Sequence, residues 1–123
     1  MQTTDFVATL FDEKTNPDKV TVAFTMALKA VSKGYSATVI LMSKGVHMGR
    51  PGYPDDMDIG APFRPVPDLM KDYLEHGGQV VVCKSCMEHG GLSAEQIDPR
   101  FEIITADDVI DLVMHAKGNL QIT

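Results

Sequence analysis

With 123 residues, 44% of them hydrophobic, the chain can bury the core of one domain and is too short for two of ordinary size. A formal net charge of −6 without any basic stripe argues against nucleic-acid phosphate as a direct partner. No apolar run approaches a membrane span, and residues 1–5 lack the charged-then-apolar pattern of a signal peptide. We therefore expect a cytoplasmic protein with one domain, residues 1–123, and no membrane contact.

The first third of the chain predicts a strand, a helix and a second strand. Phe6–Phe11 is a short apolar run typical of a strand. Asn16 suits the N-cap and Pro17 the first position of a helix, whose apolar residues then recur at helical spacing. Gly34 is expected to end this helix, and the apolar, β-rich stretch Ser36–Met42 predicts the second strand.

The segment Ser43–Pro67 holds five of the seven prolines and four of the ten glycines. Such a composition predicts a loop rather than a long regular element. A loop of this length in a small domain is usually functional or an assembly surface, although a surface excursion without a role fits equally well.

A second helix is predicted from Val66 to His76, ended by the glycine pair at 77 and 78. Gln79–Cys83 is a continuous apolar run, as expected for a strand that is covered on both faces. A short helical turn is predicted over Ser85–His89.

The last third predicts three further elements. Ser93–Gln96 has the spacing of a capping box and indicates a short helix. Phe101–Ile104 predicts a fourth strand, and Thr105 begins a last helix that Gly118 is expected to end. Leu120 and Ile122 then alternate as in a short fifth strand at the sheet edge. Alternation of strands and helices along the whole chain predicts a mainly parallel sheet with helices on both faces.

The two cysteines, Cys83 and Cys86, are the candidates for chemistry. In open α/β sheets, ligands bind at the carboxyl ends of the strands, where Cys83 is predicted to lie. The free N–H groups of the following turn, with Lys84 and His89 nearby, would stabilise a thiolate there. The alternative for Cys83 is a buried small hydrophobe. Cys86 either resolves an adduct on Cys83 or only packs.

Other kinds of site find less support in the sequence. A structural zinc site usually needs two separated ligand pairs, and the chain has one C-x-x-C, extended by His89. His47, within Lys44–Gly49, follows the second strand and could meet Cys83 at the same edge, or be a solvated loop histidine. No phosphate-binding loop occurs. We expect neither a metal nor a cofactor.

The stretch Val80–Leu92, which contains the C-x-x-C, resembles the DsrE/DsrF-like family, in particular its YchN-type members. The similarity extends to Phe101–Ala106 and, in the front half, to Lys33–Tyr35 and Gly45-Val46. The long Pro-rich segment Gly49–Pro67 departs from the familiar pattern.

The resemblance implies a three-layer α/β/α domain with a mainly parallel sheet of about five strands, assembled as trimers or hexamers. It implies a persulfide carrier, similar to the DsrEFH and TusBCD sulfur-relay subunits, in which Cys83 accepts and passes on sulfane sulfur between donor and acceptor proteins. The residues expected to surround such a site are Cys86, His47, Lys84, Ser85 and His89. Two alternatives remain: an oligomeric protein of this fold that binds a small ligand without catalysis, and a dithiol redox or metal-binding protein that uses Cys83 and Cys86.

Overall fold

The structure, a computed structural model that describes residues 1–123, is built on one five-stranded sheet with the strand order β4-β3-β2-β1-β5. The strands are β1 Phe6–Leu10, β2 Ala37–Leu41, β3 Gln79–Cys83, β4 Glu102–Ile104 and β5 Gly118–Ile122. Every neighbouring pair is parallel, which confirms the predicted parallel sheet and its five strands. The carboxyl ends of all the strands therefore lie at one edge.

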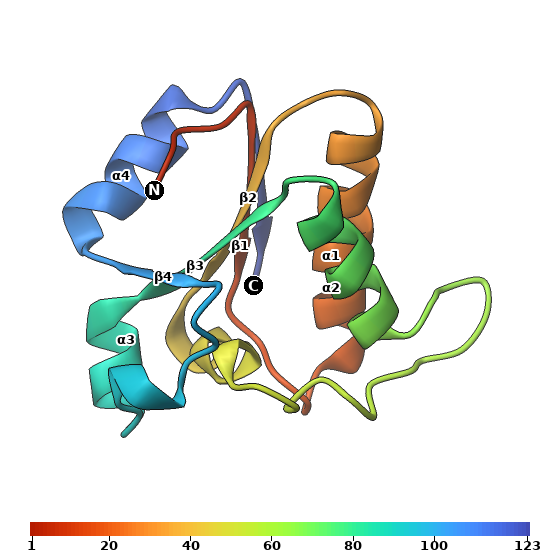
Figure 1. The fold of residues 1–123 in the computed structure, drawn as a ribbon, viewed down its shortest axis with the longest axis horizontal. Helices are drawn as coiled ribbons and strands as arrows, with labels where there is room; N and C mark the ends of the chain where they lie inside the picture. The colour runs from red at the N-terminus through yellow and green to blue at the C-terminus, as the bar shows by residue number, and fades with distance from the viewer.

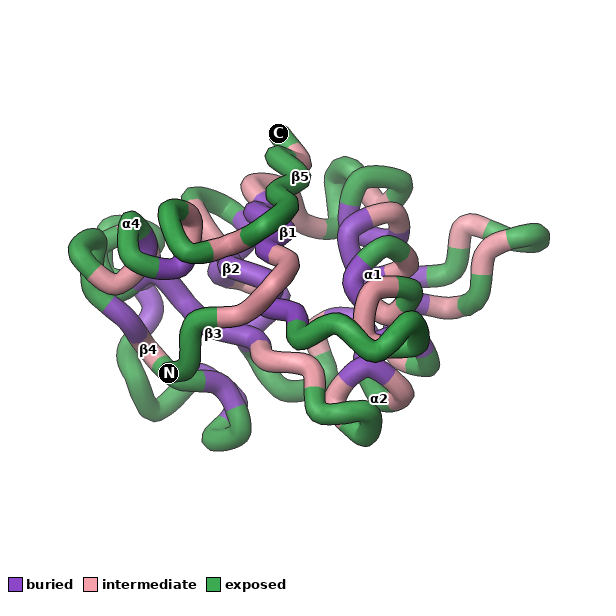
Figure 2. Tube along the Cα trace, turned by 90° about the horizontal axis from the view of Figure 1, so that it is seen from above, coloured by how far each residue is buried: buried purple, intermediate pink, exposed green.

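Helices cover both faces of this sheet (Figure 1). Helices α1, Pro17–Ser32, and α2, Val66–Glu75, pack on one face, and α4, Ala106–His115, packs on the other. The α1–α2 side belongs to a core cluster of 21 buried residues, whereas the α4 side has a cluster of six. Burial is concentrated along the central strands, while the outer faces of the helices are exposed (Figure 2). The predicted three-layer architecture is confirmed, and its two layers of helices are unequal.

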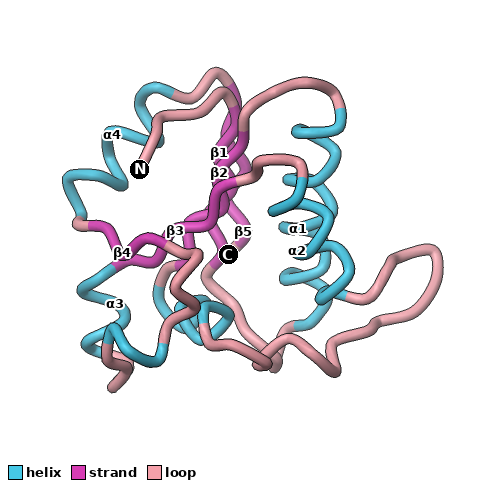
Figure 3. The backbone as a smooth tube through the Cα atoms, in the orientation of Figure 1, coloured by secondary structure: helices cyan, strands magenta, loops and turns pink.

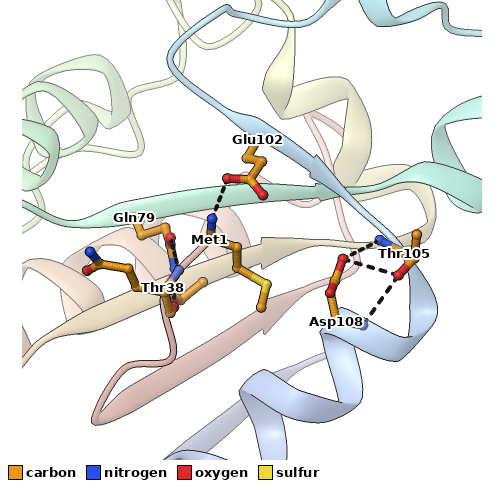
Figure 4. A network of polar contacts seen from close by, with 7 residues as sticks. Met1, Thr38, Gln79, Glu102, Thr105 and Asp108 are labelled. Atoms are coloured by element: carbon orange, nitrogen blue, oxygen red, sulfur yellow. Dashed lines mark hydrogen bonds and ion pairs between the residues drawn. The ribbon is translucent and has the colours of Figure 1, made fainter.

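The ends of α1 and the start of α4 follow the sequence, with one difference in detail at Asn16. Asn16 is the N-cap of α1, but its side-chain amide donates to the Asp12 carboxylate at 2.9 Å instead of capping the helix. Gly34 follows α1 with a φ of +93°, a conformation in which a side chain would be strained. The capping box at α4 forms between Thr105 and Asp108 (Figure 4).

The amino edge of the sheet is held by side chains. The Gln79 amide donates to the Thr38 hydroxyl at 2.8 Å, and so links β3 to β2 (Figure 4). None of the helices has the length and apolarity that crossing a membrane requires.

Gly118 does not end the last helix, as the sequence suggested, but begins β5. Helix α4 ends at His115, and Ala116 is already extended. The N–H groups of Lys117 and Gly118 both donate to the Asp5 carbonyl, at 2.8 and 3.1 Å, so the chain enters the sheet beside β1 at once. Pairing with β1 decides this boundary, and local glycine preference does not.

The segment after β2 is also more regular than its composition predicted. Ser43–Gly49 forms a 3₁₀ helix, η1, and only the remainder as far as Pro65 is an irregular loop that extends away from the sheet beside α1 and α2 (Figure 3). Two short elements follow β3: α3, Lys84–His89, begins one residue before the predicted turn, and η2, Ala94–Gln96, is a 3₁₀ turn that carries the expected capping box.

Candidate functional site at the carboxyl edge of the sheet

Two segments meet where neighbouring strands end. η1 leaves β2 and α3 leaves β3, and because β2 and β3 are paired in parallel, both segments start at the same edge. They pack against each other there and lie side by side in Figure 1. The candidate site lies between them.

The two cysteines are adjacent and differ in exposure. Cys83 is the last residue of β3 and is 5% exposed, whereas Cys86, in the first turn of α3, is half-buried. They approach each other to 3.1 Å, which is longer than a disulfide bond of about 2.05 Å. Both are free thiols, so the pair has the geometry of a reduced dithiol.

The surroundings of Cys86 favour its protonated form. Burial, and then the hydrogen bond with Cys83, raise the pKa of the Cys86 thiol, while a hydrogen bond from the Ser43 backbone acts in the opposite direction. Cys86 therefore keeps its proton at neutral pH and can donate a hydrogen bond to Cys83. Ser43 itself has a φ of +52°, a left-handed conformation that is uncommon outside glycine and is often found at functional sites.

Cys86 opens into a pocket of about 520 Å³. Its lining comes from both segments: Ser43, Lys44 and His47 of η1, and Ser85, Cys86, His89 and Gly90 from α3 and its end. The lining contains one lysine and two histidines but no carboxylate, although the whole chain carries a net charge of −6. The pocket is thus suited to a small polar or anionic group next to a thiol.

The structure brings together most of the residues that the sequence singled out, with one exception. His47, Ser85, Cys86 and His89 share the pocket, and Cys83 lies beneath Cys86. Lys84 is exposed and lines a different hollow with Met87, Glu88 and Leu92, so it does not join this group. Because α3 begins at Lys84, successive side chains point to different sides of the helix, and Lys84 and Ser85 are separated.

Sequence reasoning missed Lys44 and Ser43, which η1 turns toward the pocket. It also missed Tyr53, whose ring lies against His47 with 6.1 Å between the ring centroids and 26° between the planes. Lys44 could have been found, since it stands in the same glycine-containing stretch as His47. Nothing in the sequence pairs Tyr53 with His47, because their contact depends on the path of the Pro-rich loop.

Close packing of η1 on β1 fixes this half of the site. A side chain at Gly45 would overlap the carbonyl oxygen of Leu10, so only glycine lets η1 pack so closely on the end of β1. The Gly45 N–H donates to the Met42 carbonyl at 2.8 Å, and the Met42 N–H donates to the Leu10 carbonyl at 2.9 Å. No group of three or more histidine, cysteine or acidic side chains is arranged to hold a metal ion.

Two archaeal proteins are similar in sequence, and both are uncharacterised. One, from Methanocaldococcus jannaschii, is 30% identical over 106 residues, which cover 86% of this chain and 38% of that protein. The other, from Methanopyrus kandleri, is 28% identical over 102 residues, 82% of this chain and 79% of that protein. The chain therefore spans little more than a third of the first relative and most of the second.

Two solved structures share the fold at low sequence identity. The ychN protein from E. coli superposes with a TM-score of 0.76 at 17% identity, over 98% of this chain and 99% of that one. A conserved protein of unknown function from Bacteroides thetaiotaomicron superposes with a TM-score of 0.65 at 16% identity, over 95% of this chain and 94% of that one.

The model of the DsrE/DsrF-like family matches residues 7–122, which is nearly the whole chain. With this match and the parallel sheet in agreement, the chain belongs to the DsrE/DsrF-like family.

Proposed function

We propose that the protein is a sulfur carrier of the sulfur-relay type, in which Cys83 holds sulfane sulfur as a persulfide and Cys86 assists it. The observation that carries the proposal is the dithiol itself: Cys83 and Cys86 lie 3.1 Å apart at the carboxyl edge of the sheet, and Cys86 opens into a pocket without carboxylates. Membership of a family associated with sulfur relay supports the same conclusion.

The two cysteines suit different tasks. Cys86 keeps its proton at neutral pH because burial and Cys83 raise its pKa, so it can donate a hydrogen bond to a thiolate or persulfide on Cys83. Cys83, being almost entirely buried, would hold a persulfide away from water and oxidants. The donor would approach through the pocket on the side of Cys86.

The transfer is an exchange between sulfur atoms without net oxidation. The Cys83 thiolate attacks the terminal sulfur of a persulfide donor, and a new S–S bond forms on Cys83. The S–S bond of the donor breaks, and its electron pair leaves with the donor as a thiolate. An acceptor thiolate then attacks the outer sulfur in the same way, which returns Cys83 to its thiolate.

The decisive experiment is intact-mass measurement after incubation with a low-molecular-weight persulfide donor. The wild type should gain about 32 Da, the mass of one sulfur atom, and Cys83→Ser should not. Cys86→Ser should still load, with an adduct that is lost faster. An adduct retained in Cys83→Ser and lost in Cys86→Ser would reverse the two roles, and no adduct on any variant would end the proposal.

The partners of such a carrier would be a donor protein, an acceptor protein and further copies of this chain, as a trimer or hexamer. Exposed apolar side chains support the contacts: Ile110 and Met114 lie on one side of α4, with 60% and 76% of each exposed, and β5 is an open sheet edge. Sedimentation analysis of the wild type and Met114→Lys tests the self-association.

A reversible dithiol is the second candidate function, favoured by the same 3.1 Å separation. It requires only a shift of the two side chains to reach bonding distance. Mild oxidation would then remove about 2 Da from the intact mass, and a reducing agent would restore it. A binding protein without sulfur chemistry would show neither mass change, and its ligand affinity would be the same in Cys83→Ser.

A further inference from the structure

Tyr53 of the Pro-rich loop contacts His47, which lines the pocket. We propose that the pocket beside Cys86 binds the negatively charged group of a small sulfur donor, with His47 as its hydrogen-bond donor and Tyr53 as the residue that positions His47. This inference rests on the proposed function, because it names the chemical class of the donor that the dithiol would meet.

Tyr53 is held from three directions. Its hydroxyl donates to the Glu13 carboxylate at 2.6 Å, in the loop after β1. Burial, and then the bond to Glu13, raise the pKa of Tyr53, so the phenol stays protonated and the bond persists at neutral pH. The Lys14 ammonium lies 4.6 Å from the ring centroid and the Arg50 guanidinium carbon 5.7 Å from it.

The ring of His47 stacks on this fixed tyrosine, with an interplanar angle of 26°. Its Nδ1 is buried and has no hydrogen-bond partner. Either tautomer leaves the buried Nδ1 without a partner, but only a proton on Nε2 can be donated to a group in the pocket. An anion bound there would therefore select the tautomer with its proton on Nε2.

The rest of the pocket lining also offers hydrogen-bond donors and one positive charge to a bound group. Lys44 and His89 lie in the pocket with His47, and Ser43 and Ser85 add hydroxyl groups, whereas no acidic side chain is present. An anion placed there meets donors from both η1 and α3 without a carboxylate to repel it. The donor class that fits is a small molecule with a negative charge close to its transferable sulfur.

Two alkylating agents of nearly equal size test this directly. Iodoacetate is an anion and iodoacetamide is neutral, and both react with the same Cys86 thiolate. The ratio of their rates at Cys86, measured by site-resolved mass spectrometry and normalised to a short cysteine peptide, is independent of the thiolate fraction. It therefore reports the preference of the pocket for negative charge, whether or not the protein carries sulfur.

The wild-type ratio should exceed that of the peptide and should fall by roughly two- to tenfold in His47→Ala, the range expected for the loss of one hydrogen bond. His47→Gln, which keeps an N–H donor, should restore part of it. Tyr53→Leu should lower the ratio through loss of the stacking surface, and Tyr53→Phe should lower it less, since only the bond to Glu13 is lost.

Tyr35→Leu is the matched control, because Tyr35 is half exposed and lies with Asp5 and Lys117 at the amino edge of the sheet. Thermal midpoints within a few degrees of the wild type show that each variant is folded. A wild-type ratio equal to that of the peptide overturns the anion site. A ratio that falls in His47→Ala but not in Tyr53→Leu overturns the positioning role of Tyr53. Failure of persulfide loading with an intact ratio removes the proposed function and leaves the anion site standing.

Discussion

The two segments that form the pocket leave neighbouring strands at one edge of the sheet, yet they are built in different ways. α3 follows β3 without any intervening loop, so its residues are placed by the strand itself. η1 follows β2 after Met42 and begins at Ser43, which has a left-handed backbone. It is held against β1 at Gly45 and against Asp98, in the segment before β4, at Gly49. Cys86 belongs to α3, with Cys83 just before it at the end of β3, whereas Lys44 and His47 of the pocket lining belong to η1.

The C-x-x-C motif is local in sequence, whereas the pocket around it is not. The C-x-x-C can be recognised in isolation, because two thiols one helical turn apart suffice to define it. The pocket around it needs three contacts between segments that are far apart in sequence: η1 with β1, η1 with α3, and His47 with Tyr53. A change that loosens η1 should therefore alter the pocket and leave the dithiol in place.

The largest effect should come from Gly45→Ala. The added methyl group would overlap the Leu10 carbonyl oxygen, which belongs to the backbone of a central strand and cannot easily move. We expect a loss of about 3 kcal/mol in the free energy of unfolding, measured by urea denaturation.

Gly118→Ala is the control for this variant. A methyl group there would have ordinary contact with the Phe6 ring at 4.0 Å, and the change should cost less than about 1 kcal/mol. If the two variants lose equal stability, η1 is not fixed by close approach at Gly45.

Much of this fold can be read from the sequence, for physical reasons that particular elements make plain. β3 is apolar and buried in four consecutive residues after Gln79, as a strand covered on both faces requires. Helix α1 begins at a proline and ends before a glycine with positive φ. Gly118 was wrongly predicted to end the last helix, because its conformation is set by the pairing of β5 with β1. Pairing between segments so far apart in sequence cannot be detected in the residues around Gly118.

The site divides in the same way. Cys83 and Cys86 could be singled out as a candidate dithiol because their three-residue spacing places two thiols one helical turn apart. His47 could be singled out because β2 and β3 could be expected to be neighbours. The stacking of Tyr53 on His47 could not be predicted, since it depends on how a loop rich in proline folds back. Lys84 was expected at the site on sequence proximity alone, and helix geometry turns it to another face.

On the α3 side, Cys83→Ala should make Cys86 react faster with neutral iodoacetamide at pH 7. Cys83 contributes both a hydrogen bond and a charge interaction that raise the pKa of Cys86, so removing it should increase the thiolate fraction. We expect an increase of about three- to tenfold in rate, because the rate at pH 7 follows the fraction of Cys86 that is thiolate.

Ser85→Ala is the matched control, as Ser85 lines the same pocket but does not influence the Cys86 pKa. A slower reaction in Cys83→Ala would mean that Cys83 activates Cys86, whereas the hydrogen bond and charge of Cys83 should suppress the Cys86 thiolate.

A smaller effect is expected where a third segment braces η1. The Asp98 N–H donates to the Gly49 carbonyl at 2.8 Å. The Asp98 carboxylate accepts hydrogen bonds from the Arg100 side chain, at 2.7 Å from Nη2 and at 3.1 and 3.2 Å from Nε. Those bonds hold the pKa of Asp98 below its usual range. The stabilisation is therefore complete above the unfolded-state pKa of about 4 and is lost as the pH falls through the lower folded-state value.

Asp98→Asn should thus cost about 1 kcal/mol at pH 7 and progressively less below pH 4, as measured by denaturation across that range. Asp55 is exposed and lines the same hollow as Asp98. The stability cost of Asp55→Asn should not change in this way with pH. A constant difference between wild type and Asp98→Asn from pH 7 to pH 3 would show that the ion pair contributes nothing.

The smallest effect belongs to Ser43→Gly. Ser43 adopts a φ of +52°, which costs a residue with a side chain roughly 1 kcal/mol more than glycine, and the extra freedom of glycine in the unfolded chain cancels part of that gain. We expect the free energy of unfolding to rise by less than about 1 kcal/mol, while Ser85→Gly, inside α3, should lower it.

The backbone N–H of residue 43 remains in the Ser43→Gly variant, so the hydrogen bond to the Cys86 sulfur and the alkylation rate of Cys86 should be unchanged. A change in the alkylation rate of Cys86 would instead mean that η1 acts on the dithiol through the Ser43 hydroxyl and not through the Ser43 backbone. The two segments would then differ in the side chains they supply and not in the path of their backbones.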